Sequence, residues 1–193
     1  MDRLPARVLE PGDVQRLLVH TQGQRHHLRN RVIIMLSFKA GLRACEIGGL
    51  TWPMVLKTDG RVAQQIRVSR HIAKCGSGRN IPIHMDLKSA LADYHRSRGR
   101  PKDGPVVLSE RGGSMTARSV VNWFHDIYQQ LRLNGCSSHS GRRTFITRTA
   151  RAVGKSGGSL RDVQELAGHR SLSTTERYIV GDRDAQRKLI ALL

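Results

Sequence analysis

The sequence predicts a mainly α-helical fold with a small antiparallel β-sheet (α+β). Apolar residues recur every three or four positions along most of the chain, as on one face of a helix. Strict alternation of polar and apolar residues is confined to residues 65–69, with a plausible partner strand at 81–83. The chain has no internal repeat. At this length it can bury roughly 70% of its unfolded surface without a disulfide or metal, so we expect residues 1–193 to form a single domain.

Three helices are predicted before the sheet. The first starts at Pro11, since a proline in the first helical turn gives up an N–H that has no partner there. The second covers residues 28–40 and ends at Gly41, a residue that readily takes the left-handed conformation of a helix stop. A third, short helix is expected to begin near Arg43.

A two-stranded hairpin follows. Residues 65–69 alternate as a half-buried strand does, and residues 81–83 form the expected partner. Pro82 indicates an edge, because proline has no N–H to donate to a neighbouring strand. The intervening residues 74–79 contain two glycines and two cations, so they predict a flexible basic hairpin tip.

The remaining chain reads as helical. A helix over 86–98 ends at Gly99, a brief strand is predicted at 106–108, and Thr116 is expected to cap a long helix through its side-chain oxygen.

Four more segments complete the helical part. They are 140–153, stopped by Gly154; a helix capped by Ser159 and ended by Gly168; 173–180; and a C-terminal tail helix at 184–193.

Charge defines the expected partner. The formal net charge of +18 makes a polyanion the expected ligand, and nucleic acid is the commonest one. Aromatic residues are only 4% of the chain, which disfavours a single-strand binder built on stacked bases and favours double-stranded DNA. A membrane surface is the alternative, but we find no apolar run long enough to span a bilayer and no signal peptide.

Cysteines and acidic residues give no sign of a metal or cofactor. Cys45, Cys75 and Cys136 are widely spaced and odd in number, so they read as free thiols in a reducing compartment and not as zinc ligands. No cluster of carboxylates of the two-metal nuclease type is present, and we expect no cofactor.

Two stretches of the chain lack acids. One runs from Arg61 to Met85 and the other lies between Asp126 and Asp162. Taken alone, each of these runs fits an ordinary solvent-exposed face as well as it fits a phosphate-binding surface. Because both contain candidate catalytic residues, they favour one continuous phosphate-binding surface.

Three short motifs carry residues suited to phosphate chemistry. Arg43 follows a glycine at the start of a helix, where a cation opposes the helix dipole and Glu46 could hold it; a local ion pair is the simpler explanation. His139 and Arg142 share a helix face near an N-terminus, although such pairs are usually surface residues.

The third motif is a Gly-His pair, Gly168-His169, with Tyr178 nine positions after the histidine. Singly, these residues read as a helix stop with a capping histidine and a half-buried aromatic. Together with the two arginines they can break a phosphodiester bond. Arginines can stabilise the pentavalent transition state, an imidazole can take the proton of the tyrosine, and a hairpin lysine can protonate the leaving oxygen.

These motifs resemble the tyrosine recombinases, also called the phage integrase family. Residues 41–47 (GLRACEI), 139–145 (HSGRRTF) and 166–178 (LAGHRSLSTTERY) look like its first arginine box, its His-x-x-Arg box, and its Gly-His box with the nucleophile. The resemblance covers nearly the whole chain from Leu9 onward and implies the catalytic-domain fold of that family.

The resemblance implies a role for each residue. Arg43 and Arg142 would clamp the scissile phosphate, with Glu46 supporting Arg43. His139 would be the general base and Lys74 the general acid. His169 would hydrogen-bond the phosphate, and Tyr178 would form a 3′-phosphotyrosyl bond without metal or ATP. Further expected DNA contacts are Arg67, Arg70, Arg79, Arg143, Arg148 and Arg170, with Arg79 the second choice for the hairpin cation.

Two departures from the family pattern stand out. Gly141 replaces the usual leucine before the second arginine, which could loosen the helix or let DNA approach closely. About 40 residues precede Arg43, so the N-terminal DNA-clamping domain of the family is expected to be absent. The apolar tail 184–193 is expected to dock on a neighbouring subunit or to pack on its own domain.

The expected function is site-specific recombination of double-stranded DNA by a homotetramer, in the cytoplasm at the nucleoid. An accessory DNA-binding protein could supply the DNA contacts that the N-terminal clamping domain makes in the family. The alternatives are a DNA-binding regulator that does not cleave and, ranked lower, a type IB topoisomerase.

Overall fold

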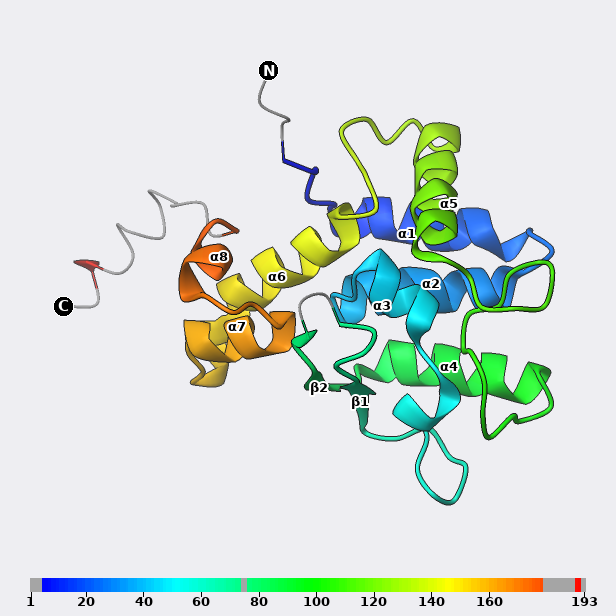
Figure 1. The fold of residues 1–193 in the computed structure, drawn as a ribbon. Coiled ribbons are helices and arrows are strands. Elements are labelled where there is room, and N and C mark those ends of the chain that lie inside the picture. Colours follow the sequence, from blue (N-terminus) through cyan, green and yellow to red (C-terminus); the bar gives the residue numbers. More distant parts are fainter. Residues whose placement is uncertain (1–4, 74–75, 179–189, 192–193) are drawn as a thin grey trace.

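The computed structural model describes residues 5–73, 76–178 and 190–191. Figure 1 shows the elements in chain order. The helices are α1 (Pro11–Gln22), α2 (His27–Lys39), α3 (Ala44–Gly49), α4 (Met85–Ser97), α5 (Ala117–Gln130), α6 (Ser140–Ala152), α7 (Leu160–Ala167) and α8 (Leu172–Glu176), with 3-10 turns η1 (Trp52–Met54) and η3 (Val153–Ser156). The strands are β1 (Gln65–Val68) and β2 (Arg79–Pro82). The mainly α fold with a small antiparallel sheet is therefore confirmed.

Helix α2 is the centre of the main core. It contacts α1, α3, α4 and α6. Its buried residues lie on every side of the helix and include Arg29 and all positions from Val32 to Phe38. A helix at the surface usually buries one apolar face only, whereas a helix that its neighbours enclose is buried on all sides. Helix α2 is of the second kind. The helix ends before Gly41, which has the left-handed φ of +62°.

The hairpin forms as predicted. Strands β1 and β2 are antiparallel with Ile66 opposite Ile81, and both isoleucines are buried. Pro82 ends β2 opposite Gln65. The strand predicted at 106–108 is wrong: Leu108 makes only an isolated bridge to Ser114. Val106 and Val107 are nevertheless buried, so the apolar run is explained by a segment that passes through the core without a partner strand.

The C-terminal helices differ from the prediction at their ends. Thr116 caps α5 and Ser159 caps α7 as expected, but Gly154 does not end α6. The chain continues as η3 to Gly157, whose φ of +70° makes it the actual stop. Helix α8 is shorter than the predicted 173–180, and nearly all of the predicted tail helix 184–193 lies outside the described residues.

Gly141 has a packing role that corrects the sequence interpretation. A Cβ at this position would overlap the Oγ of Ser37 and lie 2.9 Å from its Cβ. Glycine therefore lets α6 approach α2 closely, and neither a loosened helix nor an approaching DNA backbone is needed to explain it. This contact fixes the start of α6, which carries His139 and Arg142.

Buried apolar residues form two clusters. The main cluster is built on α1–α5 and the sheet, with Trp52 and Phe124 among its largest members. The smaller cluster consists of Ile146, Val163 and Ala167, with Tyr178 packed against it. Helix α6 links the two, and α7 and α8 lie around its far end (Figure 1). Within the described part of the chain, no helix is long and apolar enough to span a membrane.

Candidate active site

One pocket gathers residues from all three motifs. It has a volume of about 310 Å³ and lies where α3, the hairpin tip, the start of α6 and the α7–α8 segment meet. The lining residues are Arg43, Ser77, His139, Arg142, Gly168, His169, Arg170, Thr174 and Tyr178. Five of the six predicted catalytic residues therefore surround a single pocket, although they come from distant parts of the chain.

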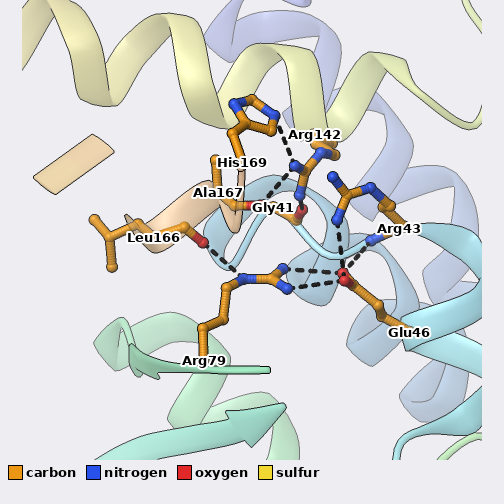
Figure 2. A network of polar contacts seen from close by, with 8 residues as sticks. All are labelled: Gly41, Arg43, Glu46, Arg79, Arg142, Leu166, Ala167 and His169. Atoms are coloured by element: carbon orange, nitrogen blue, oxygen red, sulfur yellow. Dashed lines mark hydrogen bonds and ion pairs between the residues drawn. The ribbon is translucent and has the colours of Figure 1, made fainter. Parts of the chain in front are cut away.

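Arg43 is held by Glu46 at the start of α3. Its backbone N–H donates to Glu46 Oε2 at 2.9 Å and its Nη1 to Oε1 at 3.1 Å. Glu46 is fully buried. Burial raises the pKa of this carboxyl, but the hydrogen bonds and charges of Arg79 and Arg43 outweigh burial and hold the pKa below its ordinary value. Glu46 therefore stays an anion, and the prediction that it supports Arg43 has a clear geometric basis (Figure 2).

Arg142 is buried and fixed by carbonyl groups. Its Nη1 donates to Gly41 O at 2.8 Å, and its Nη2 donates to Ala167 O at 2.6 Å and to His169 Nε2 at 2.9 Å. Burial, with the charges of Arg43 and Arg79, lowers the pKa of Arg142 to about 10, so it is still a cation at neutral pH. A buried, pre-oriented guanidinium of this kind is suited to an incoming phosphate.

His169 is held in one tautomer. Arg142 has only donors, so Nε2 of His169 accepts, and the ring proton must sit on Nδ1. Nδ1 then donates to Thr175 Oγ1 at 2.9 Å. Burial, followed by the charges of Arg142, Arg43 and Arg79, lowers the pKa of His169 to about 4. The imidazole is neutral at physiological pH, and a hydrogen bond from its Nε2 to a phosphate requires a rearranged or protonated ring.

Tyr178 lies directly beside these groups. Its ring stacks on His169 with centroids 5.6 Å apart and planes 21° apart. The guanidinium carbon of Arg143 is 5.7 Å from the centre of the same ring, and the Tyr178 carbonyl accepts from Thr147 Oγ1 at 3.3 Å. The tyrosine ring therefore contacts His169 and Arg143 at the edge of the pocket.

His139 stands at the N-cap of α6 and is exposed. Its backbone N–H donates to Ser137 Oγ at 3.3 Å, which ties the turn before the helix. His139 lines the pocket together with Arg142 of the same helix. Lys74, the predicted general acid, lies outside the described residues.

Arg79 is placed differently from the expected DNA contact. Its side chain is only 6% exposed, and its Nη1 and Nη2 donate to the two oxygens of Glu46 at 2.8 and 2.9 Å. Its Nε donates to Leu166 O at 2.9 Å. The guanidinium is thus directed at the protein interior (Figure 2).

The other predicted DNA contacts occupy varied positions. Arg70 and Arg170 are exposed, and Arg170 lines the pocket. Arg67 donates to Pro53 O at 3.0 Å and Arg148 to Leu9 O at 2.8 Å, so both also tie loops to the fold. Arg143 was predicted as a DNA contact, and its guanidinium lies over the Tyr178 ring.

Sequence reasoning missed Thr175. It is fully buried and is the partner that fixes the His169 tautomer. The available signal was its place six residues after the histidine, which puts it on the short helix leading to Tyr178. Ser77 and Thr174 were also missed and line the pocket.

The arrangement can bind and polarise a phosphate. Two guanidiniums and the neutral imidazole lie around the same space as a tyrosine hydroxyl group and a second histidine. Arginine donors in a partly buried site stabilise the charge that develops on phosphoryl oxygens. Among the described residues, no group of three or more histidines, cysteines or carboxylates is arranged to hold a metal ion.

The comparisons with known proteins agree with this geometry. The sequence pattern of the phage integrase family matches residues 7–183. The chain is 31% identical over 160 residues to the tyrosine recombinase XerC of Pelobacter propionicus, covering 82% of this chain and 49% of that protein. It is 30% identical to XerC of Shewanella amazonensis, covering 88% and 55%. The chain thus spans about half the length of these curated relatives.

Solved structures show the same fold. The Tn1549 transposon integrase, in complex with transposon right end DNA, superposes with a TM-score of 0.78 at 23% identity, covering 100% of this chain and 67% of that chain. XerA recombinase gives a TM-score of 0.71 at 20% identity, covering 99% and 64%. With the family pattern matched over most of its length, the chain belongs to the phage integrase family, the tyrosine recombinases.

Proposed function

We propose that this chain is the catalytic part of a site-specific recombinase that cleaves and rejoins double-stranded DNA. The observation that carries the proposal is the single pocket around Arg43, His139, Arg142, His169 and Tyr178. Several solved relatives support DNA as the substrate, since they are complexes of an integrase or recombinase with DNA.

In the proposed reaction, the Tyr178 hydroxyl oxygen attacks the scissile phosphorus while the bond from phosphorus to the 5′ oxygen breaks. His139 takes the phenolic proton and Lys74 gives a proton to the leaving 5′ oxygen. Arg43 and Arg142 stabilise the negative charge on the non-bridging oxygens. The product is a 3′-phosphotyrosyl bond, and attack by another 5′ hydroxyl reverses the step, so no ATP is consumed.

Assembly and location follow from the substrate. Exchange between two duplexes requires four active sites, so we propose a homotetramer on DNA, with an accessory DNA-binding protein as a further partner. Action on DNA places the protein in the cytoplasm at the nucleoid. Exposed cations such as Arg70 and Arg170 are proposed to meet phosphates, so DNA affinity should fall steeply with salt.

The test is covalent capture. The full chain is incubated with a library of nicked duplexes with a randomised central sequence, and protein–DNA adducts are isolated on a denaturing gel and sequenced. We expect adducts that share a sequence, and their loss in Tyr178→Phe. Adducts that persist in Tyr178→Phe would exclude this tyrosine as the nucleophile.

Tyr128→Phe is the matched control. Its hydroxyl group is buried and, within the described part of the chain, has no hydrogen-bond partner, so this variant should retain full adduct formation. Adducts without shared sequence, together with relaxation of supercoiled DNA, would favour a topoisomerase. Tight binding without any adduct would favour a regulator that does not cleave.

A further inference from the structure

We propose that Arg79 is a positioning residue for strand cleavage, which holds Glu46 so that Arg43 remains available to the phosphate. This inference rests on the proposed recombinase function. It assigns Arg79 a task inside the protein in place of the DNA contact expected from the sequence.

Burial and hydrogen bonding argue against a direct DNA contact. The Arg79 side chain is 6% exposed, and its Nε, Nη1 and Nη2 all donate to protein oxygens at 2.8–2.9 Å. A phosphate would have to displace a buried bidentate ion pair to reach this guanidinium, and breaking a buried pair is strongly destabilising. The Arg43 side chain, in contrast, is 17% exposed and lines the pocket.

Glu46 is shared between the two arginines in a specific way. Arg79 takes both carboxylate oxygens in a fork, while the Arg43 side chain reaches only Oε1 through one donor. Carboxylates favour bidentate pairing with guanidinium. If Arg79 were absent, Glu46 would be free to pair with both ends of the Arg43 fork and to draw it away from the phosphate. Arg79 therefore keeps the Arg43 donors free.

The carboxyl end of α7 provides a second anchor. Its last carbonyl groups have no partner within the helix and carry partial negative charge. Leu166 O accepts from Arg79 and Ala167 O accepts from Arg142. Two buried guanidiniums thus connect the helix that precedes His169 to β2 and α6 (Figure 2).

Gly168 makes room for this contact. Its φ of +63° suits glycine, and a Cβ there would lie 2.9 Å from Cδ and 3.0 Å from Nη1 of Arg79. The glycine of the Gly-His pair thus serves two ends: it stops α7 and it admits the Arg79 side chain. Arg79, on β2, is thus bound to α3 through Glu46 and to α7 through Leu166 O.

The experiment compares Arg79→Lys with the wild-type chain on a duplex selected by covalent capture. Lysine keeps the charge but loses the fork. We expect adduct formation at saturating DNA to slow by about 10- to 100-fold, less than the roughly 100- to 1,000-fold loss that follows removal of a donor in contact with the transition state. Arg79→Met also removes the charge and should leave the salt slope of binding unchanged, whereas loss of a phosphate contact would lower that slope by about 1.

A methylphosphonate at the scissile position separates positioning from general damage. A methyl group replaces one non-bridging oxygen, so the linkage is uncharged and its cleavage depends less on arginine. We expect the defect of Arg79→Lys to shrink to a few-fold on this substrate, in parallel with Arg43→Ala. Arg31→Lys is the matched control, because Arg31 also pairs with a carboxylate, Asp93, but lies away from the pocket.

The outcomes are distinct. A defect of equal size on both substrates, or a reduced salt slope with normal cleavage, overturns the positioning role. Normal cleavage in Arg79→Lys does the same and leaves the proposed function intact. If the wild-type chain forms no adduct on any duplex, the proposed function fails and this inference fails with it.

Discussion

The two hydrophobic clusters support the two sides of the candidate active-site pocket by different means. The main cluster encloses α2 with apolar side chains from several helices and the sheet, and it carries the segment that leads to Arg43. The smaller cluster has Ile146, Val163 and Ala167 as its buried members, yet it supports the side with His169 and Tyr178. That side is tied to the rest by polar bonds from buried arginines to Leu166 O and Ala167 O.

The comparison teaches that fold and pocket geometry depend on different forces. Apolar burial stabilises the main body roughly in proportion to area. The α7–α8 side buries little apolar surface, so its position depends on directional hydrogen bonds. Changes in the main cluster should therefore alter global stability, whereas changes in the polar contacts should alter cleavage first.

A matched pair of substitutions tests this directly and has the largest expected effect. Ile33 in α2 and Ile146 in α6 are both fully buried. Ile33→Ala should lower the free energy of unfolding by about 2–5 kcal/mol, because the packed main core cannot collapse around the cavity. Ile146→Ala should fall at or below the lower end of that range in denaturant unfolding. Equal losses in the free energy of unfolding would show that the two clusters do not stabilise the two sides of the pocket separately.

Gly141→Ala should disturb the joint between the two sides. The added Cβ meets Ser37 between α6 and α2, and overpacking of this kind costs about 1–3 kcal/mol. Thermal unfolding would measure the loss. Gly154→Ala is the control, since a Cβ there has nothing within 4 Å. A Gly141→Ala chain as stable as wild type would show that α6 can shift freely.

Thr175→Val should affect the pocket more than the fold. The variant keeps the shape but leaves the buried Nδ1–H of His169 without its acceptor, at a cost of about 1–3 kcal/mol. We expect the tautomer to be lost and adduct formation to slow. Imidazole ¹⁵N shifts report the tautomer. Thr149→Val, which removes a bond to Phe145 O on α6, should leave those shifts unchanged.

A further effect is a pH dependence of stability. The pKa of His169 is lowered from 6.5 to about 4 in the folded chain, so the unfolded chain takes up a proton first as pH falls. The stabilising contribution of neutral His169 is therefore complete above pH 6.5 and is lost as the pH falls toward 4. Denaturant unfolding at several pH values should show this slope, and His169→Gln should flatten it. If the pH dependence of the free energy of unfolding is unchanged in His169→Gln, a group other than His169 causes it.

The candidate site could be predicted from the sequence where its residues lie in short motifs. The three boxes identified Arg43, His139, Arg142, His169 and Tyr178, and the pocket brings those five together. Glu46 was also identified, because its partner Arg43 is three residues away. Thr175 was missed, since a buried threonine has no local pattern that distinguishes it from an ordinary helix residue.

The sequence by itself determined most of the helices, the hairpin and the candidate catalytic residues, because periodicity, caps and local motifs act over a few residues. Only the tertiary structure decided which groups the arginines hold. Arg79 meets Glu46 across 33 positions and Leu166 across 87, and Arg142 meets Gly41 across 101. Such pairings depend on how α3, β2, α6 and α7 pack, and the energy of a buried ion pair depends on the surroundings that this packing creates.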